Sequence, residues 1–352
     1  MSIKERIFLP CAVLAGVCLI FLRDAVADGI RNALSLSGEI LIPSLLPFMV
    51  LSSFTAEMWN SHSGSFADKF MKKLFRLPAE CAQVLFFGFT GGYPVGMSLA
   101  GRLYEKGSIS EEEAEYISCF CVNAGPAFVV SVAGGAAAGS VKAGVVLLCA
   151  TEAAALITGI VYARRRPCRE NGKPLSVNKT EPSSALVGAV KSSQENILSV
   201  CMWVAVFSVF TSVTASFIKN DTLLLVLSSV AEVTAGVSRA MQAGGLPLAA
   251  AAISFGGLSV MCQLIPVIKK CGIRIYKFLI FRIINGILSY FITELLLCFV
   301  DIEIQTLAEN ASVFSSNAPA SAALLIMGAV LISDVSRSEI LTEFFHHRQY
   351  QR

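Results

Sequence analysis

Six long, nearly uncharged apolar runs are the feature that most limits what this chain can fold into. They lie at roughly 7–22, 40–58, 139–163, 193–218, 275–300 and 319–336. A helix of about 20 apolar residues crosses a bilayer, so each run predicts a transmembrane helix. Across the 352 residues, 55% are hydrophobic and 15% are charged, whereas soluble domains carry about 25% charged residues. This balance excludes a soluble enzyme and predicts an all-α polytopic membrane protein, whose surroundings are the lipid bilayer.

Cysteine and histidine limit the chemistry. Cys168 and Cys271 lie in basic loops that we expect to face a reducing cytoplasm, and the other cysteines lie in apolar segments, so no disulfide framework is expected. The histidines, His62, His346 and His347, lie outside every apolar run. Without an intramembrane histidine, neither a serine dyad nor a zinc protease of the usual kind can be assembled. We therefore expect no enzyme, no catalytic residue, no metal site and no cofactor. The net charge of +3, with aromatics outside basic clusters, indicates no nucleic-acid partner.

Loop charges orient the predicted helices. Basic residues are concentrated in segments 59–80, 164–191 and 264–277, whereas 301–318 carries acidic residues and no Lys or Arg. The positive-inside rule places the three basic segments in the cytoplasm and 301–318 outside. Prolines and serines in 164–191 predict a solvated linker between two halves.

The first run, 7–22, has two interpretations that remain open. It is either a transmembrane helix or, with Lys4 and Arg6 before it and Ala25-Val26-Ala27 after it, a cleaved signal peptide. Apolar residues between 26 and 41 recur near helical spacing, which predicts a helix lying in the membrane interface.

Two further apolar regions, 81–138 and 222–262, each contain two apolar stretches. The orientation allows each region only one net crossing, so one stretch of each pair must turn back. The two halves then follow the order helix, re-entrant hairpin, broken helix, helix, in opposite senses. Such an inverted repeat is typical of secondary transporters that bind their substrate at the bilayer midplane. The predicted organisation is 1–39 (first helix and interfacial helix), 40–163 (first repeat), 164–191 (linker), 192–300 (second repeat), 301–318 (external loop) and 319–352 (C-terminal helix and cytoplasmic tail).

Each of these stretches contains a break in its helical pattern. The breaks are Gly88 to Gly96, Asn123 to Pro126, Glu232 to Gly236, and Ser254 to Gly257. Proline and glycine leave backbone N–H and C=O groups free at membrane depth, where they must face protein or a water-filled cavity. Half-helix N-termini favour carboxylates or phosphates, so the breaks predict a site for a small anion. A packing kink is the alternative for the Asn123 and Gly91 to Pro94 breaks.

Three acidic residues lie within apolar runs: Glu152, Glu232 and Glu294. Ionisable residues in membranes are expensive and usually functional, so these are candidates for coupling to H⁺ or Na⁺ or for gating. An ion pair of Glu232 with Arg239 is an alternative, as are hydrogen bonds from neighbouring helices to Glu152 and Glu294.

Three motifs carry a family resemblance: Gly91-Gly92-Tyr93-Pro94-Val95-Gly96, Cys121-Val122-Asn123-Ala124-Gly125-Pro126 and Glu232-Val233-Thr234-Ala235-Gly236. Over nearly its full length the chain resembles the YlbJ family of sporulation integral membrane proteins, in the nucleoside-recognition or Gate-domain group. Through that group it is similar to the concentrative nucleoside transporter fold. The resemblance implies that 81–101 and 222–241 are the hairpins. It also implies a multi-pass bacterial membrane protein that carries dipicolinic acid across the outer forespore membrane.

Dipicolinate, a planar pyridine with two carboxylates, suits the free backbone donors at the breaks, with Tyr93 available for stacking. Glu232 would repel a dianion unless it is protonated or paired, which favours a coupling or gating role. A nucleoside carrier and a non-transporting sporulation scaffold are the alternatives, and a homo-oligomer is compatible with either. The predicted substrate-binding residues are Thr90, Gly91, Gly92, Tyr93, Pro94, Asn123, Gly125, Thr234, Gly236, Gly256, Gly257 and Gln263.

Overall fold

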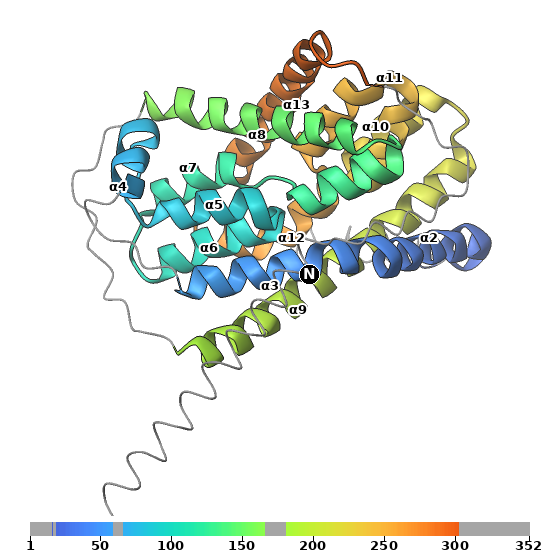
Figure 1. The fold of residues 1–352 in the computed structure, drawn as a ribbon. Coiled ribbons are helices and arrows are strands. Elements are labelled where there is room, and N and C mark those ends of the chain that lie inside the picture. The colour runs from blue at the N-terminus through green and yellow to red at the C-terminus, as the bar shows by residue number, and fades with distance from the viewer. Residues whose placement is uncertain (1–15, 17–18, 59–65, 166–180, 303–352) are drawn as a thin grey trace, which may run out of the picture.

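The computed structural model describes residues 16, 19–58, 66–165 and 181–302 (Figure 1). Within these residues the chain forms helices and connections and no strand, which confirms the all-α prediction. The predicted helix at 319–336 lies outside the described residues, as do nearly all of the external loop 301–318, most of the first run at 7–22 and the centre of the linker 164–191.

The helices fall into two groups along the chain. The first group comprises α2 (Arg23–Ser35), the π-helical η1 (Leu36–Leu41), α3 (Ile42–Met58), α4 (Phe66–Phe70), η2 (Met71–Phe75), α5 (Cys81–Gly91), α6 (Tyr93–Glu105), α7 (Glu111–Cys121), the π-helical η3 (Ala127–Ala137) and α8 (Val141–Ala163). The second group comprises α9 (Pro182–Phe217), α10 (Asp221–Ala231), α11 (Val233–Phe255), α12 (Gly257–Lys270) and α13 (Ile275–Leu297).

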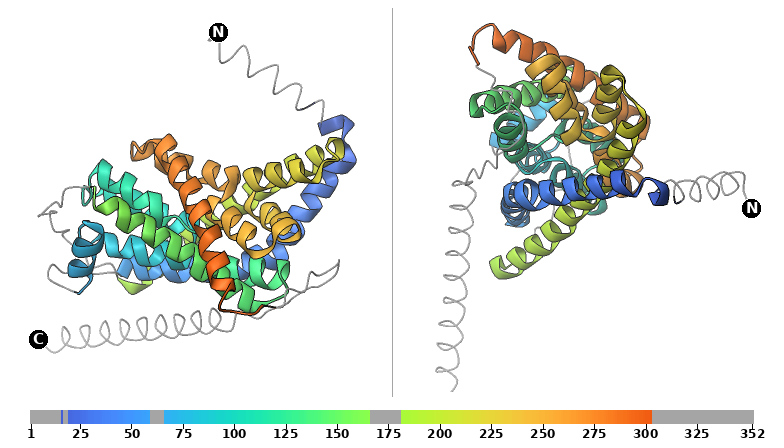
Figure 2. Two further views of the ribbon diagram at one scale, coloured as in Figure 1. Left: turned by 90° about the horizontal axis from the view of Figure 1, so that it is seen from above. Right: turned by 90° about the vertical axis from the view of Figure 1, so that its right-hand side faces the viewer.

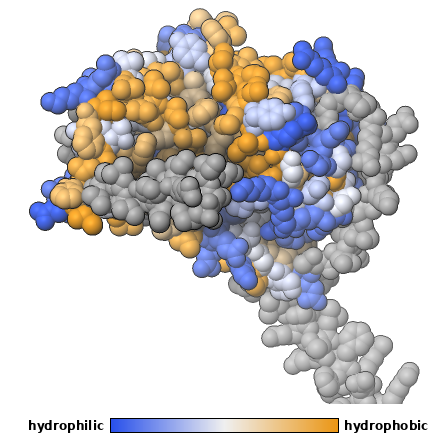
Figure 3. Space-filling model, turned by 180° about the vertical axis from the view of Figure 1, so that it is seen from behind, coloured by the Kyte–Doolittle hydropathy of each residue, from blue (hydrophilic) through white to orange (hydrophobic). Residues whose placement is uncertain are grey.

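Five helical stretches are long and apolar enough to cross a membrane: Arg23–Met58, Val141–Ala163, Pro182–Phe217, Val233–Lys270 and Ile275–Leu297. Their exposed faces are apolar. On α9, Met202, Val206 and Phe210 follow one another at helical spacing and are each at least half exposed. Figure 3 shows the broad apolar surface that such residues form, bordered by hydrophilic groups. A surface of this kind is stable in lipid, so the chain is a multi-pass membrane protein.

In each half a short helix forms a hairpin with the helical segment that follows it: α5 with α6, and α10 with the part of α11 before its kink at Gly245. α5 and α10 have 11 residues each, about 16 Å of helix, roughly half of the ~30 Å hydrocarbon core. A Cβ atom on Gly96 of α6 would lie 2.9 Å from the Cα atom of Gly88, so α5 and α6 run back along each other. In the second hairpin, a Cβ on Gly236 would lie 2.7 Å from the Cα of Ser229. These contacts confirm the hairpins predicted at 81–101 and 222–241.

Each hairpin is followed by a broken helix. α7 ends at Cys121, and η3 begins at Ala127 after a non-helical connection. In the second half, α11 changes direction at Gly245, where φ is 67°, and the part before this kink belongs to the hairpin. The part after it is the first piece of the broken helix, which is interrupted at Gly256, where φ is 82°, and continues as α12. The order hairpin, broken helix, 23-residue helix is therefore found in both halves, with α8 and α13 as the equivalent final helices. This order of elements agrees with the predicted one, and the opposite orientation of the two halves in the membrane stays a prediction.

The long helices α2–α3 and α9 cross on one side of the molecule, and the other helices are grouped on the opposite side (Figures 1 and 2). α2 continues through η1 into α3, where the sequence predicted a separate interfacial helix at 26–41. The reason is close packing: Ser208 of α9 donates a hydrogen bond to the Gly29 carbonyl at 2.9 Å. α9 itself begins at Pro182, inside the predicted linker, because proline suits the first turn of a helix.

Candidate functional site

The tip of each hairpin rests against the break of the following helix. A Cβ atom on Gly125 would lie 3.1 Å from the backbone nitrogen of Gly92, which itself has a φ of 87°. In the second half, a Cβ on Gly257 would lie 3.2 Å from the Cα of Glu232. These positions need glycine because two backbones approach closely there.

A tyrosine connects the two halves at the same level. Tyr93 lies at the tip of the first hairpin. Its hydroxyl donates a 2.6 Å hydrogen bond to the carbonyl of Ile253, just before the break at Ser254 to Gly257 in the second half. The four breaks predicted from the sequence therefore lie together at the centre of the molecule.

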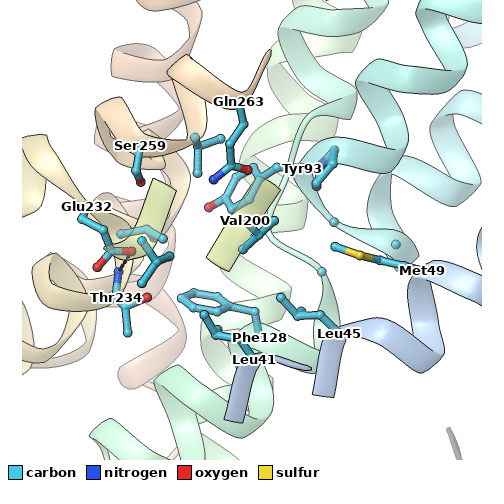
Figure 4. Close-up of a pocket in the computed structure, with 17 residues that line it drawn as sticks. Leu41, Leu45, Met49, Tyr93, Phe128, Val200, Glu232, Thr234, Ser259 and Gln263 are labelled. Atoms are coloured by element: carbon cyan, nitrogen blue, oxygen red, sulfur yellow. Dashed lines mark hydrogen bonds between the residues drawn. The ribbon is translucent and has the colours of Figure 1, made fainter. Parts of the chain in front are cut away.

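A narrow cavity of about 40 Å³ lies at this centre (Figure 4). α3, α9 and η3 supply apolar side chains, whereas α11 and α12 supply polar ones. The lining residues are Leu41, Leu45, Met49, Gly91, Gly92, Tyr93, Pro94, Gly125, Phe128, Val200, Val204, Glu232, Val233, Thr234, Ser259, Val260 and Gln263. The cavity thus combines an aromatic and aliphatic wall with a polar wall, as small-molecule sites commonly do.

Glu232 caps the helix that it precedes. Its carboxylate accepts hydrogen bonds from the backbone N–H groups of Thr234 at 2.9 Å and Ala235 at 2.7 Å. The residue is 3% exposed, and no ion pair joins it to Arg239 in the described part of the chain. The predicted alternative of a Glu232–Arg239 pair is therefore wrong. The N-terminus of α11 already holds an anion, which is this side chain.

The other half-helix N-termini at the centre have no such cap. α6 follows Gly92, η3 follows Pro126 and α12 follows Gly256, and none of these residues makes a side-chain capping bond. Gly92 and Gly125, just before two of these N-termini, line the cavity. Pro94 has no N–H, and the N–H groups of Val95 and Val129 donate to the Gly92 and Gly125 carbonyls at 3.2 and 3.1 Å. The N–H groups that remain for a ligand at α6 and η3 are those of the first residues, Tyr93, Ala127 and Phe128.

Arg282 is a central residue that the sequence analysis did not select. It lies in α13, is 1% exposed, donates through Nη1 to the carbonyl of Val122 and donates through Nε to the carbonyl of Phe255 at 3.2 Å. These carbonyls end α7 and α11, one in each half. The guanidinium carbon also lies 5.5 Å from the centre of the Tyr93 ring. A single arginine within the apolar run 275–300 was the available signal, because charges in such runs are rarely without a role.

Seven predicted substrate-binding residues line the cavity: Gly91, Gly92, Tyr93, Pro94, Gly125, Thr234 and Gln263. The other five do not. The Asn123 amide donates to the Phe120 carbonyl at 2.9 Å, which satisfies the end of α7. Thr90 lies in a separate hollow between α3 and α5.

The remaining three are glycines that allow close backbone packing. Gly236 packs on Ser229 inside the hairpin, Gly256 lies against Tyr93 and Arg282, and Gly257 lies against Glu232. The sequence missed Phe128, Met49 and Ser259, because nothing in an apolar or hydroxyl side chain distinguishes a cavity wall from a helix contact.

The acidic candidates separate in space. Glu232 lines the cavity. The Glu152 carboxylate is buried without a hydrogen-bond partner in the described structure, and it does not line the cavity. Glu294 is exposed near the end of α13. Of the three, only Glu232 is therefore positioned to act directly on a bound solute.

Comparisons with known proteins give one informative relative. No family model matches the chain, and no solved structure matches it. The chain is 26% identical over 311 residues to "Sporulation integral membrane protein YlbJ" of Bacillus subtilis (strain 168), a match that covers 75% of this chain and 76% of the relative. This similarity agrees with the motifs at the hairpin tips and breaks, which the structure brings together at the centre. The chain is similar over three quarters of its length to this sporulation integral membrane protein.

Proposed function

We propose that the protein is a carrier that binds a small planar organic anion in the central cavity. Dipicolinate, moved across the outer forespore membrane during sporulation, is the substrate that the family resemblance implies. The observation that carries the proposal is the arrangement of half-helix ends around the cavity.

The half-helix ends favour an anion electrostatically. Each helix N-terminus carries roughly half a positive charge, and those of α6, η3 and α12 lack a side-chain cap. The carbonyl ends of α7 and α11, which carry the opposite partial charge, are bound by Arg282. Glu232 offsets one N-terminus, that of α11. The uncapped N-termini that border the cavity, those of α6 and η3, are thus left to bind a carboxylate.

The apolar wall suits an aromatic ring. Phe128 and Tyr93 lie at the cavity with Leu45 and Met49 beside them (Figure 4). Ring stacking and apolar contact would hold a pyridine between them, while its carboxylates reach backbone N–H groups.

Glu232 is the proposed coupling or gating residue. Its carboxylate holds the first turn of α11, at the place where the hairpin tip meets the cavity. Binding of a proton or a cation would weaken this cap and reduce the repulsion of an anionic solute. The hairpin tip would then respond to the coupling ion.

A nucleoside-like solute is the second candidate, favoured by one observation. No Lys or Arg is among the described residues that line the cavity, whereas Gln263, Ser259 and Glu232 offer neutral and acidic hydrogen-bonding groups. Such groups suit the hydroxyls and ring edges of an uncharged solute.

Uptake by proteoliposomes separates these functions. We expect labelled dipicolinate to accumulate with the natural chain and not with Ser259→Phe, which fills the cavity without changing its charge. Ser216→Phe, on the exposed outer turn of α9, is the matched control and should transport normally. Uptake of uridine alone would support the second candidate. Absence of both uptakes in correctly inserted protein would contradict a carrier and favour a scaffold.

A further inference from the structure

A second hollow adjoins the central cavity at Glu232. It has a volume of about 390 Å³ and lies between α2, α9, α10 and α11. We call it the serine hollow, because its wall is rich in hydroxyls; the polar residues that matter below are Asn32, Ser208, Thr211, Ser212, Ser238 and Arg239. Val204, Glu232 and Thr234 line both spaces. The two spaces therefore meet at the tip of the α10–α11 hairpin.

α9 presents different faces to the hollow and to lipid. Ser208, Thr211 and Ser212 lie on the hollow side, at helical spacing. Val206 and Phe210, close to them in sequence, are 56% and 50% exposed on another face. The hydroxyl-bearing face of this membrane-length helix is thus turned away from the lipid-facing residues.

Helix packing explains only part of this polarity. Ser208 binds the Gly29 carbonyl, and Thr211 binds the Ser208 carbonyl at 3.0 Å, so these hydroxyls have local partners. Arg239 does not fit that explanation, because it is half-buried and forms no ion pair with any described residue. A charge among membrane helices needs water or a counter-ion. Arg239 lies two helical turns from Glu232, about 10 Å along α11.

The hollow in the first half has a different character. It measures about 550 Å³ and lies between α3 and α5. Residues such as Phe48, Leu51 and Phe86 line it, and none of its described lining residues is charged. Of these two hollows, the one with a polar lining and an arginine is that of the second half, where α10 begins at Asp221 on the side predicted to be external.

We propose that the serine hollow is the outer approach to the central cavity, where Arg239 attracts the carboxylate of the incoming solute. A positive charge in a cleft with low-dielectric walls raises the local concentration of anions. Glu232 separates this approach from the cavity, so a solute must pass the hairpin tip to reach the site. This inference rests on the proposed carrier function, but its test does not require transport.

Cysteine labelling measures both the water and the potential in the hollow. Ser212→Cys is reacted in sealed proteoliposomes with membrane-impermeant anionic and cationic thiosulfonates, each rate being normalised to a free thiol in solution. Peptide mass spectrometry reads position 212 separately from the native cysteines. Val206→Cys, on the lipid-facing side of α9 and about 9 Å from position 212 along the helix, is the control. Adding Arg239→Gln removes the charge, and Lys219→Gln removes a charge from the neighbouring exposed loop.

We expect position 212 to react at least tenfold faster than position 206. The normalised anionic rate should exceed the cationic rate several-fold, and Arg239→Gln should abolish this preference while Lys219→Gln leaves it. Equal labelling at 206 and 212, or an unchanged preference in Arg239→Gln, would overturn the proposal. Normal labelling without uptake of dipicolinate would keep the outer approach and reject the substrate, so the two failures are distinguishable.

Discussion

At the scale of single residues, Arg282 binds the carbonyl ends of α7 and α11 and so touches both halves. Arg282→Gln removes a charged donor from two buried carbonyls, which costs about 2–3 kcal/mol of unfolding free energy. Arg282→Lys keeps the charge but cannot reach both carbonyls with a planar fork, so we expect intermediate stability and partial uptake. Thermal unfolding in detergent and uptake by proteoliposomes measure the two effects.

Lys142→Gln is the control for this series, because Lys142 is exposed at the start of α8. It should match the natural chain in both measurements. If Arg282→Gln also unfolded and transported like the natural chain, Arg282 would have no role in holding the breaks.

Glu115 of α7 provides a pH-dependent contact outside the five membrane-length segments. Burial raises its pKa, but hydrogen bonds from the Arg274 side chain at 2.8 Å, from Lys277 at 2.7 Å and from the Arg274 backbone lower it to about 2, below the ordinary 4.5. Because the folded pKa is depressed, the stabilisation is complete above pH 4.5 and is lost as the pH falls toward 2. We expect Glu115→Gln to lower the unfolding free energy by roughly 2 kcal/mol at pH 7.

Chemical denaturation of both chains between pH 7 and pH 3 tests this contact. The difference between them should shrink below pH 4.5, where the natural chain loses its advantage. A difference that stayed constant over this range would contradict the assignment of Glu115 as the titrating group.

Glu232 and Arg282 illustrate what could be predicted at this scale. The position of Glu232 at a break was predictable, because an acidic residue in an apolar run is conspicuous. The hydrogen-bond partner of Glu232 could not be predicted, because the backbone N–H groups of Thr234 and Ala235 compete with Arg239 for its carboxylate. The carbonyls that bind Arg282 are far away in sequence or in another helix, and no periodicity in one chain indicates such a pairing.

At the scale of helices, the hairpin tips and breaks depend on glycine. Gly125 is packed against the backbones of Gly92 and Thr90, with a Cβ contact of 3.1 Å to the nearest atom. We expect Gly125→Ala to reduce uptake several-fold and Gly125→Val to abolish it, because the tip must move away from the break. Membrane insertion should remain normal, since the change is local.

Gly188 of α9 is the matched control, because nothing lies within 4 Å of a Cβ built on it. Gly188→Ala should leave uptake unchanged, and fluorescence-detected size exclusion reports insertion for all variants. Full uptake by Gly125→Val would show that the contact between tip and break is dispensable.

The breaks in the helices could be predicted from the sequence, but the ends of some helices could not. The broken stretches were predictable because Gly and Pro interrupt a helix for local steric reasons, and loop charge limited how many stretches could cross. The lengths of α2 and α9 could not be predicted, because the sequence pattern does not reveal that these helices pack on each other through Gly29 and Val209. Helix boundaries that depend on such contacts cannot be obtained from propensity.

At the scale of the whole molecule, ion pairs join the two halves on the side predicted to be cytoplasmic. Glu115 of α7 binds Arg274 and Lys277 at the start of α13, and Glu105 of α6 pairs with Lys270 of α12. The serine hollow lies on the side predicted to be external. We therefore expect these ion pairs to hold the inner side closed while the proposed outer approach admits the solute.

The central claim is that four helix breaks together form the binding site for an aromatic anion. Its most direct test is a cryo-electron microscopy map of the purified protein with saturating dipicolinate, aligned with a rigid binding protein and compared with a map without solute. We predict additional density between Phe128, Tyr93 and Gln263, with its carboxylate ends at the N-termini of α6 or η3. A central cavity that stays empty at saturating dipicolinate, or density found only at another surface, would contradict the claim.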